Sequence, residues 1–265
     1  MKTITLTYHD VVADGDLDSS GFSGTGPAGP ARYKVDASAF RRHLEVIKSC
    51  AQLEPTLVTD RQPDGPGTRL YLTFDDGGIG AATHAAGMLE EFGWRGHFFV
   101  VGDLIGRKAF MTADQIRDLC RRGHVIGSHS QTHPRVFLRL PYTEMVKEWR
   151  SSRELLTQLT GAPVTTAAVP GGHYSARVGA AAREAGIQHL FTSNPGLRVR
   201  GLAGQCSTYD RFGVFRNTPD ATIGRYVSAN RTQVFREVLV WKTKRAAKAV
   251  LGDLYLTVRR FLLRG

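Results

Sequence analysis

The chain has 265 residues, of which 42% are hydrophobic and 22% charged. This composition fits one large globular domain or two small ones and excludes a disordered or fibrous protein. Its formal charge of +11 raises the question of an acidic partner, and its three cysteines lack the spacing of a disulfide framework or a thiolate zinc site.

The basic excess lies near the C-terminus. Residues 231–265 contain nine basic and two acidic residues, a net charge of +7, which leaves +4 for the first 230 residues. Because the charge characterises this end of the chain, we expect no nucleic-acid partner. We predict two regions: a folded domain of residues 1–230 and a basic, amphipathic helical tail of residues 231–265.

Seven strands are predicted along the chain. The first, at 3–8, alternates apolar residues with threonines, which is the period of a strand. Further apolar runs predict strands at 69–74, 96–101, 124–128, 164–169, 189–192 and 212–215. Helical spacing predicts a helix after Asp36, which we expect to cap it, and helices at 81–92, 113–122, 142–160 and 176–185. Thr112 is the expected N-cap of the helix at 113–122, and Ser175 that of the helix at 176–185.

Strands that alternate with helices indicate a mostly parallel sheet covered by helices. We therefore predict an α/β fold, a distorted (β/α) barrel of about seven parallel strands that is closed or nearly closed. An open, doubly wound sheet is the alternative. Barrels of this kind carry their reactive groups on the loops after the C-terminal ends of the strands, so polar residues there are candidates for one site.

Four polar segments follow predicted strands: His9-Asp10, Asp75-Asp76-Gly77-Gly78, His129 to His133, and Pro170-Gly171-Gly172-His173. The turn that the paired glycines permit lets both aspartates face one cavity. Two histidines four residues apart can bind one metal ion, and with a carboxylate they leave coordination positions open for water and substrate. Such a site is more often catalytic than structural.

The motifs TFDDG at 73–77, HSQTH at 129–133 and PGG at 170–172, in this order after strands, resemble those of the polysaccharide deacetylases. The resemblance covers roughly residues 1–216. Members of this family are metal-dependent enzymes with a NodB-like homology domain and a distorted (β/α) barrel. The resemblance implies that Asp75 is the general base and that Asp76, His129 and His133 hold the metal.

The chain also departs from the family pattern. The arginine that usually orients the base is replaced by Ala168, and Arg216 or Arg211 is the expected substitute. The fourth motif, an aspartate followed by a tryptophan, has no counterpart near 192–196. The fifth, a Leu-His, is absent because no histidine follows His189. The chain opens instead with TYHDV at 7–11, similar to circularly permuted members that act on poly-N-acetylglucosamine, which implies that His9 is the general acid.

The predicted function is metal-dependent removal of N-acetyl groups from N-acetylhexosamine residues of a polysaccharide or oligosaccharide, as in the assembly of a surface polysaccharide. Zn²⁺ is the expected ion, with Co²⁺ or Ni²⁺ as alternatives. Gly171 is the candidate oxyanion donor through its backbone N–H. Expected substrate contacts are His173, Pro170, Gly172 and Arg216.

Three other functions remain open. The same mechanism could act on a small amide or ring imide, and the cavity shape would distinguish a polymer from a small molecule. An inactive carbohydrate-binding relative would account for the missing arginine. Two histidines and one carboxylate also describe non-haem Fe(II) oxygenases, but that interpretation leaves Asp75 unexplained.

The tail has two interpretations. Apolar residues recur at helical spacing between Val234 and Leu263, with Lys and Arg on the flanking surface. The helix could pack on the barrel with a solvated basic face, or it could attach the protein to an anionic membrane leaflet. Because the first residues alternate apolar and polar side chains, unlike a signal peptide, we expect a cytoplasmic protein, at the inner membrane face if the second interpretation holds. A lipid-linked saccharide would then be a suitable substrate.

Overall fold

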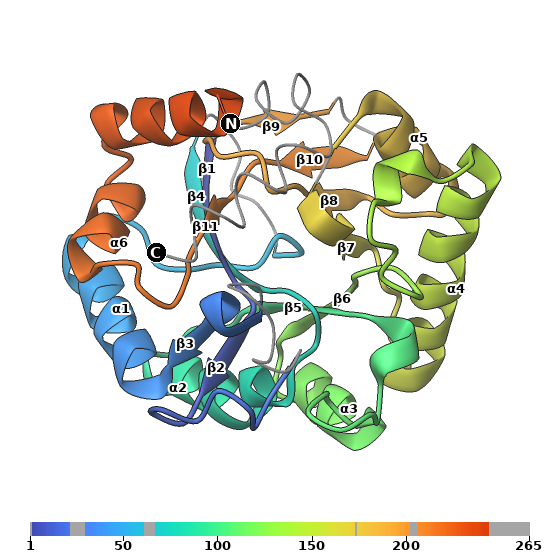
Figure 1. Cartoon of the computed structure of the whole chain (residues 1–265), viewed down its shortest axis with the longest axis horizontal. Coiled ribbons are helices and arrows are strands. Elements are labelled where there is room, and N and C mark those ends of the chain that lie inside the picture. The colour runs from blue at the N-terminus through green and yellow to red at the C-terminus, as the bar shows by residue number, and fades with distance from the viewer. Residues whose placement is uncertain (1, 22–29, 61–66, 173, 202–205, 244–265) are drawn as a thin grey trace, which may run out of the picture.

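The computed structural model describes residues 2–21, 30–60, 67–172, 174–201 and 206–243. At its centre is a curled sheet with helices on the outside (Figure 1). The hydrogen-bonded strand order is β11 (Phe212–Gly213), β1 (Lys2–Tyr8), β4 (Thr68–Phe74), β5 (His97–Val100), β6 (Val125–Ser128), β7 (Thr166–Ala168), β8 (His189–Phe191), β10 (Ser207–Tyr209) and β9 (Val199–Arg200). Every neighbouring pair is parallel except β10 and β9.

The predicted α/β fold with a curled, mostly parallel sheet is confirmed. All seven expected strands are present, and the sheet is extended by the parallel strand β10 and the antiparallel strand β9. The segment that leads into β9, at one end of the strand order, approaches β1 near the other end. There the Thr3 N–H donates to the Leu197 carbonyl (3.1 Å), and the backbones of Lys2 and Arg198 form an isolated antiparallel β-bridge. The sheet is therefore curled into a distorted barrel.

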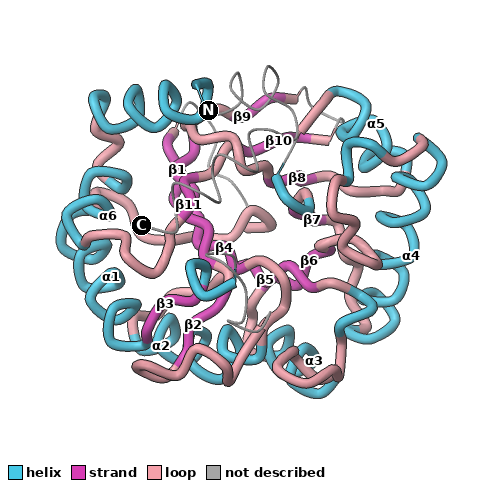
Figure 2. Tube along the Cα trace, viewed as in Figure 1, coloured by secondary structure: helices cyan, strands magenta, loops and turns pink. Residues whose placement is uncertain are grey.

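The helices surround this sheet (Figure 2). They are α1 (Ala37–Cys50), α2 (Ala86–Glu91), α3 (Ala113–Arg121), α4 (Tyr142–Thr160), α5 (Ala176–Glu184) and α6 (Asp220–Val227). A π-helical segment, Ala81–Ala85, precedes α2, so the helix expected at 81–92 begins with a wider turn. A small parallel sheet of β2 (Asp10–Val12) and β3 (Lys34–Asp36) was not predicted.

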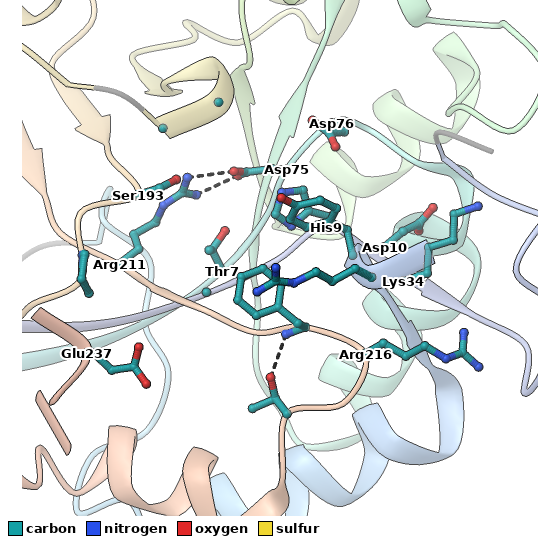
Figure 3. Close-up of a pocket in the computed structure, with 18 of the residues that line it drawn as sticks. Thr7, His9, Asp10, Lys34, Asp75, Asp76, Ser193, Arg211, Arg216 and Glu237 are labelled. Atoms are coloured by element: carbon teal, nitrogen blue, oxygen red, sulfur yellow. Dashed lines mark hydrogen bonds and ion pairs between the residues drawn. The ribbon is translucent and has the colours of Figure 1, made fainter. Parts of the chain in front are cut away.

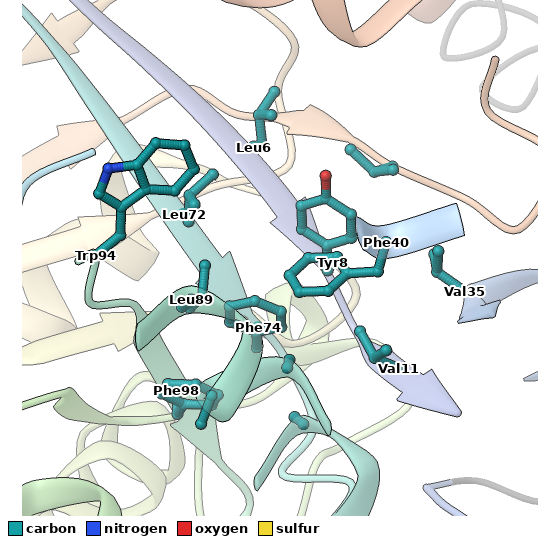
Figure 4. Close-up of a cluster of buried hydrophobic side chains, with 14 of the residues drawn as sticks. Leu6, Tyr8, Val11, Val35, Phe40, Leu72, Phe74, Leu89, Trp94 and Phe98 are labelled. Atoms are coloured by element: carbon teal, nitrogen blue, oxygen red, sulfur yellow. The ribbon is translucent and has the colours of Figure 1, made fainter. Parts of the chain in front are cut away.

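Alternation along the strands divides the apolar side chains between the two faces of the sheet. On the outer face, Leu6 and Tyr8 of β1 are buried in the cluster that contains Phe40 of α1, and the Tyr8 and Phe40 rings meet edge to face at 5.0 Å (Figure 4). The inner face holds a separate cluster of Val58, Tyr71, Phe99, Ala168, Phe191 and Tyr209. Side chains therefore fill the barrel interior, which leaves its rim for a binding site.

Two of the three expected helix caps form. Thr112 and Gln115 make a reciprocal capping box at α3, and the Ser175 hydroxyl accepts a backbone N–H at the start of α5. Asp36 occupies the N-cap position of α1, but its side chain makes no capping bond and instead binds Arg216 (2.9 Å). The prediction for Asp36 was wrong because a longer-range ion pair competes for its carboxylate.

His97 links two backbone segments inside the barrel. Its Nδ1 donates to the Leu72 carbonyl (3.0 Å) and its Nε2 accepts from the Val58 N–H (2.9 Å). Burial lowers the pKa of His97 to about 4, so the folded chain keeps it neutral while the unfolded chain binds a proton near pH ~6.5.

The free energy of unfolding should therefore fall as pH drops from ~6.5 toward ~4, by up to about 3 kcal/mol through His97. Denaturant titrations at several pH values measure this slope. A His97→Gln variant, although less stable, should have a shallower slope over the same range. The same slope in both proteins would show that His97 does not cause the loss of stability at low pH.

A helix occupies 231–243, at the beginning of the predicted tail, and the remainder of that tail lies outside the described residues. Within the described ranges, no helix has both the length and the hydropathy needed to cross a bilayer.

Candidate active site

The two aspartates of the TFDDG motif sit in a tight turn at the end of β4. The Asp75 N–H donates to the Tyr8 carbonyl (3.0 Å), which continues the pairing of β4 with β1. Asp76 adopts a left-handed conformation (φ 74°), and the chain then passes close to Asp10, so that a Cβ on Gly78 would lie 2.0 Å from its carboxylate. Only glycine fits there, and the turn places both aspartates at the rim of the barrel.

Asp76, His129 and His133 form a compact group of possible metal ligands. Their nearest ligand atoms all lie within 4.8 Å of one another. Asp76 Oδ1 is 3.3 Å from His129 Nε2 and 3.5 Å from His133 Nε2. The Nδ1 of His129 donates to the Ala168 carbonyl (2.9 Å), which orients the ring and leaves Nε2 for a metal. The donor set and this orientation fit a divalent cation.

The HSQTH segment is held in a non-helical conformation. Ser130 (φ 66°) and His133 (φ 55°) are both left-handed, a conformation that costs roughly 1–3 kcal/mol for each residue. The Ser130 hydroxyl accepts the His133 N–H, and Glu148 of α4 accepts the N–H groups of Gln131 and Thr132. Sequence patterns missed Glu148 because an acidic residue on an amphipathic helix usually faces solvent.

Asp75 forms a buried, two-pronged ion pair with Arg211. The Nη1–Oδ1 distance is 2.7 Å and the Nη2–Oδ2 distance is 2.8 Å, and both side chains are almost fully buried. The Arg211 Nε also donates to the Thr192 carbonyl (2.7 Å), which fixes the guanidinium. Burial alone would raise the pKa of Asp75, but the charges of Arg211 and of His129 outweigh it and hold this pKa below its usual range.

Arg211 supplies the guanidinium that the family pattern would place at Ala168. It follows β10, and its guanidinium lies 5.9 Å from the centre of the Phe99 ring, which belongs to the same inner cluster as Ala168. Arg216, the other candidate, pairs with Asp36 instead. The candidate base, Asp75, is thus paired with an arginine that lies between β10 and β11.

Replacing Arg211 with alanine should lower the free energy of unfolding by about 3–5 kcal/mol, because it leaves the buried Asp75 carboxylate unpaired. Arg216→Ala is the matched control. Asp36, the partner of Arg216, is about a quarter exposed, at 24%. Loss of this ion pair should therefore lower the free energy of unfolding by about 1 kcal/mol or less. Denaturant titration compares the two variants. Equal losses of unfolding free energy in both would contradict the assigned role of Arg211.

His9 directly follows β1 and lines the same cavity as Asp75 and Asp76. Its ring lies 4.4 Å from that of Tyr33, and its buried Nδ1 has no hydrogen-bond partner among the described residues. Burial lowers the pKa of His9, while the carboxylates of Asp76 and Asp75 oppose this shift. No sequence pattern indicated the contact with Tyr33, since it depends on how the segment before β3 folds over the barrel rim.

The third motif forms a tight turn after β7. Gly171 (φ 64°) and Gly172 (φ 71°) are left-handed, and the Gly172 N–H donates to the Val169 carbonyl (2.8 Å). Gly171 therefore stays the candidate oxyanion donor. Pro170 is buried and is not among the residues that line the cavity, so its substrate contact stays a prediction. His173 lies outside the described residues.

These residues surround one cavity of about 1710 Å³ (Figure 3). Eight of the ten predicted site residues line it: His9, Asp75, Asp76, His129, His133, Gly171, Gly172 and Arg216. Small-molecule sites usually enclose roughly 300–1,000 Å³. The cavity is thus large enough for an extended ligand.

A curled parallel sheet with acidic and imidazole side chains at the C-terminal ends of its strands belongs to the (β/α)-barrel class, whose enzymes carry their active sites at this position. Residues 62–190 match the model of the polysaccharide deacetylase family. YxkH of Bacillus subtilis (strain 168), a protein assigned to the polysaccharide deacetylases, is 28% identical over 144 residues, which are 54% of this chain and 50% of YxkH. The matched residues form a polysaccharide deacetylase domain, a family whose members are hydrolases. This chain spans about half the length of YxkH.

Solved structures show the same fold. IcaB from Ammonifex degensii superposes with a TM-score of 0.69 at 20% identity, over 86% of this chain and 97% of IcaB. The Streptococcus pyogenes deacetylase PplD in complex with acetate gives 0.67 at 18% identity, over 83% of this chain and 96% of PplD. The de-N-acetylase from Aggregatibacter actinomycetemcomitans gives 0.67 at 17% identity, over 85% and 100%.

Proposed function

We propose that this chain is a divalent-metal-dependent deacetylase that removes acetyl groups from N-acetylhexosamine residues of a polysaccharide or oligosaccharide. The observation that carries the proposal is the pairing of two functions in one cavity. A buried carboxylate, Asp75, is fixed by Arg211, and the adjacent Asp76 belongs to a group of metal-ligand type with His129 and His133. The family match supports the reaction class.

Each residue has a distinct role in amide hydrolysis. Asp76, His129 and His133 would hold the cation, with Zn²⁺ as the expected ion, which when bound polarises the acetamide carbonyl and acidifies a coordinated water. Asp75 accepts a proton from the attacking water, and the Gly171 N–H stabilises negative charge on the carbonyl oxygen. His9 donates a proton to the departing nitrogen, so that acetate and a free amine leave.

The cavity favours a polymer or oligosaccharide over a small amide or imide. Its volume of about 1710 Å³ exceeds what a compact substrate would fill. An inactive carbohydrate-binding relative would not need a buried, arginine-fixed carboxylate. Arg211 also removes the argument for inactivity that the missing arginine at Ala168 had raised.

Acetate release from N-acetylated monosaccharides, chitooligosaccharides, lipid-linked saccharides and small amides tests the proposal, with metal content measured on the same samples. We expect acetate from the saccharides only, and only from metal-loaded protein. Turnover of a small amide alone, or no acetate from any compound after loading with Zn²⁺, Co²⁺ or Ni²⁺, would contradict it.

His9→Ala should reduce turnover by ~100-fold or more, the usual contribution of an acid–base group, while metal content stays at the level of the unchanged protein. Because a general acid must be protonated, loss of His9 should also remove the alkaline limb of the pH–rate profile. Tyr33→Ala, which removes only the ring packed on His9, is the comparison variant and should retain that limb. An unchanged profile in His9→Ala would exclude His9 as the acid.

We also propose that the protein works at the cytoplasmic face of a membrane on saccharides carried by lipid. Supporting features are the net charge of +7 in residues 231–265 and the exposure of Phe235 (68%) and Leu239 (49%) on the helix at 231–243. Basic residues near an anionic surface contribute about 1 kcal/mol each.

Sedimentation with phosphatidylserine-containing vesicles tests this location at low and high salt. The protein should bind these vesicles and not neutral ones, and a Phe235→Glu/Leu239→Glu variant should bind more weakly. If the intact chain binds no better than one truncated after Arg231, the location is wrong.

A further inference from the structure

The helix at 231–243 forms part of the wall of the catalytic cavity. Five of its residues line that cavity, at positions i, i+3, i+4, i+7 and i+8: Gln233, Arg236, Glu237, Val240 and Trp241. This spacing places them on one face of the helix. The first part of the predicted tail therefore shares a binding surface with residues of the first 230, and Figure 1 shows it beside α6 at the edge of the barrel.

The lining face is held to α6 by a hydrogen-bond network. The Glu237 Oε1 accepts from the Tyr226 hydroxyl (2.8 Å) and from the Gln233 side-chain amide (2.9 Å). Tyr226 itself stacks on Phe212 of β11 at 4.6 Å. The network connects the helix to the strand next to β1, so this wall has a defined position relative to His9 and Asp75.

The wall is well separated from the reacting groups. Figure 3 shows Glu237 on a different side of the cavity from Asp75 and Asp76. A single acetylated sugar at Asp75 would leave this part of the cavity of about 1710 Å³ unfilled. A longer chain of sugars would occupy both parts.

The chemistry of the face suits a sugar ring. Carboxylate, amide and guanidinium groups exchange hydrogen bonds with hydroxyls, and a flat indole packs against the apolar face of a pyranose. We infer that Gln233, Arg236, Glu237 and Trp241 form a distal subsite for a glycosyl unit of the same substrate, away from the acetamide that reacts. This inference rests on the proposed function and specifies its substrate as an oligosaccharide or polymer.

A distal subsite has a kinetic signature that depends on chain length. Its contacts are the same in the ground and transition states, so their loss raises KM and leaves kcat unchanged. Trp241→Ala and Arg236→Ala should each raise KM for the hexasaccharide of N-acetylglucosamine by about 10-fold, which corresponds to about 1.4 kcal/mol. KM for the disaccharide, which we expect to be too short to fill both parts of the cavity, should not change.

Two variants on the same helix serve as comparisons. Lys242→Ala removes a cation at an exposed position that is not part of the lining and should behave as the unchanged protein. Trp241→Phe keeps an aromatic ring and should restore part of the hexasaccharide affinity. Calorimetric binding of the hexasaccharide to Asp75→Asn, with and without Trp241→Ala, gives a readout that is independent of turnover.

The outcomes separate this inference from the proposed function. If the unchanged protein deacetylates both saccharides but Trp241→Ala and Arg236→Ala affect them equally, or affect neither, the distal subsite is wrong and the deacetylase function stands. If the unchanged protein releases no acetate from either saccharide and Asp75→Asn binds neither, both are wrong.

Discussion

His133→Ala should lose bound metal and deacetylase activity together. His133 contributes one of three ligand atoms that lie within 4.8 Å of one another, and two remaining donors rarely hold a catalytic cation. Its side chain is 26% exposed, so alanine should disturb the fold less than at His129, whose ring is buried and bonded to the Ala168 carbonyl. Turnover should fall to the level of the chelator-treated protein.

Metal content by atomic emission, measured with turnover on the same preparation, checks this result. His84→Ala is the control, because His84 lies in the π-helical segment and does not line the cavity; it should keep both metal and activity. Full metal occupancy with unchanged turnover in His133→Ala would show that the site is misassigned. Chelation should inactivate the unchanged protein, and added Zn²⁺ should restore it.

The strands of the barrel could be predicted because each has its own apolar pattern. Thr3 to Tyr8 alternates along β1, and the other six expected strands are short runs of buried residues. The strands that were missed, β2, β3, β9 and β10, have two or three residues each. The strands β7, β8 and β11 are as short, but they lie within the apolar runs at 164–169, 189–192 and 212–215. The missed strands lie in no such run and form through their neighbours in the fold.

The candidate site was predictable where its residues are adjacent in sequence. Asp75 with Asp76, and His129 with His133, could be grouped because their spacing lets each pair face one cavity, and the structure places all four at that cavity. Their individual roles were predicted from the resemblance to the polysaccharide deacetylases. Arg211 could be named only as one of two candidates, since its contact with Asp75 spans 136 positions. The curvature of the sheet brings Arg211 to Asp75, and no local sequence pattern predicts that curvature.

The lining helix shows the same limit. Net charge separated residues 231–265 from the rest of the chain, and on that basis the helix was assigned to a tail. The structure places Gln233, Glu237 and Trp241 along the catalytic cavity. Charge describes how a segment meets solvent or a membrane, whereas the position of a helix depends on contacts such as the bond between Tyr226 and Glu237.

Asp75→Asn should retain bound metal while its turnover falls by ~100-fold or more. Asparagine has nearly the same shape and can still accept one of the two hydrogen bonds from Arg211, but its NH2 group cannot accept the other, and the side chain cannot take a proton from water. Asp75 is not among the three clustered ligands, so metal binding should not depend on its charge. Turnover and metal content, measured on the same samples, check the result, and circular dichroism shows whether the fold is kept.

Asp76→Asn is the matched variant, because the same change one residue later should fail differently. Asp76 Oδ1 lies close to both imidazoles, and the His129 side chain, together with the charges of His9 and His133, holds the pKa of Asp76 low against the effect of burial. Its replacement should weaken metal binding, and excess Zn²⁺ should recover part of the turnover. Excess metal should recover nothing in Asp75→Asn, since there the missing group is the proton acceptor. Loss of metal in Asp75→Asn but not in Asp76→Asn would reverse the two roles.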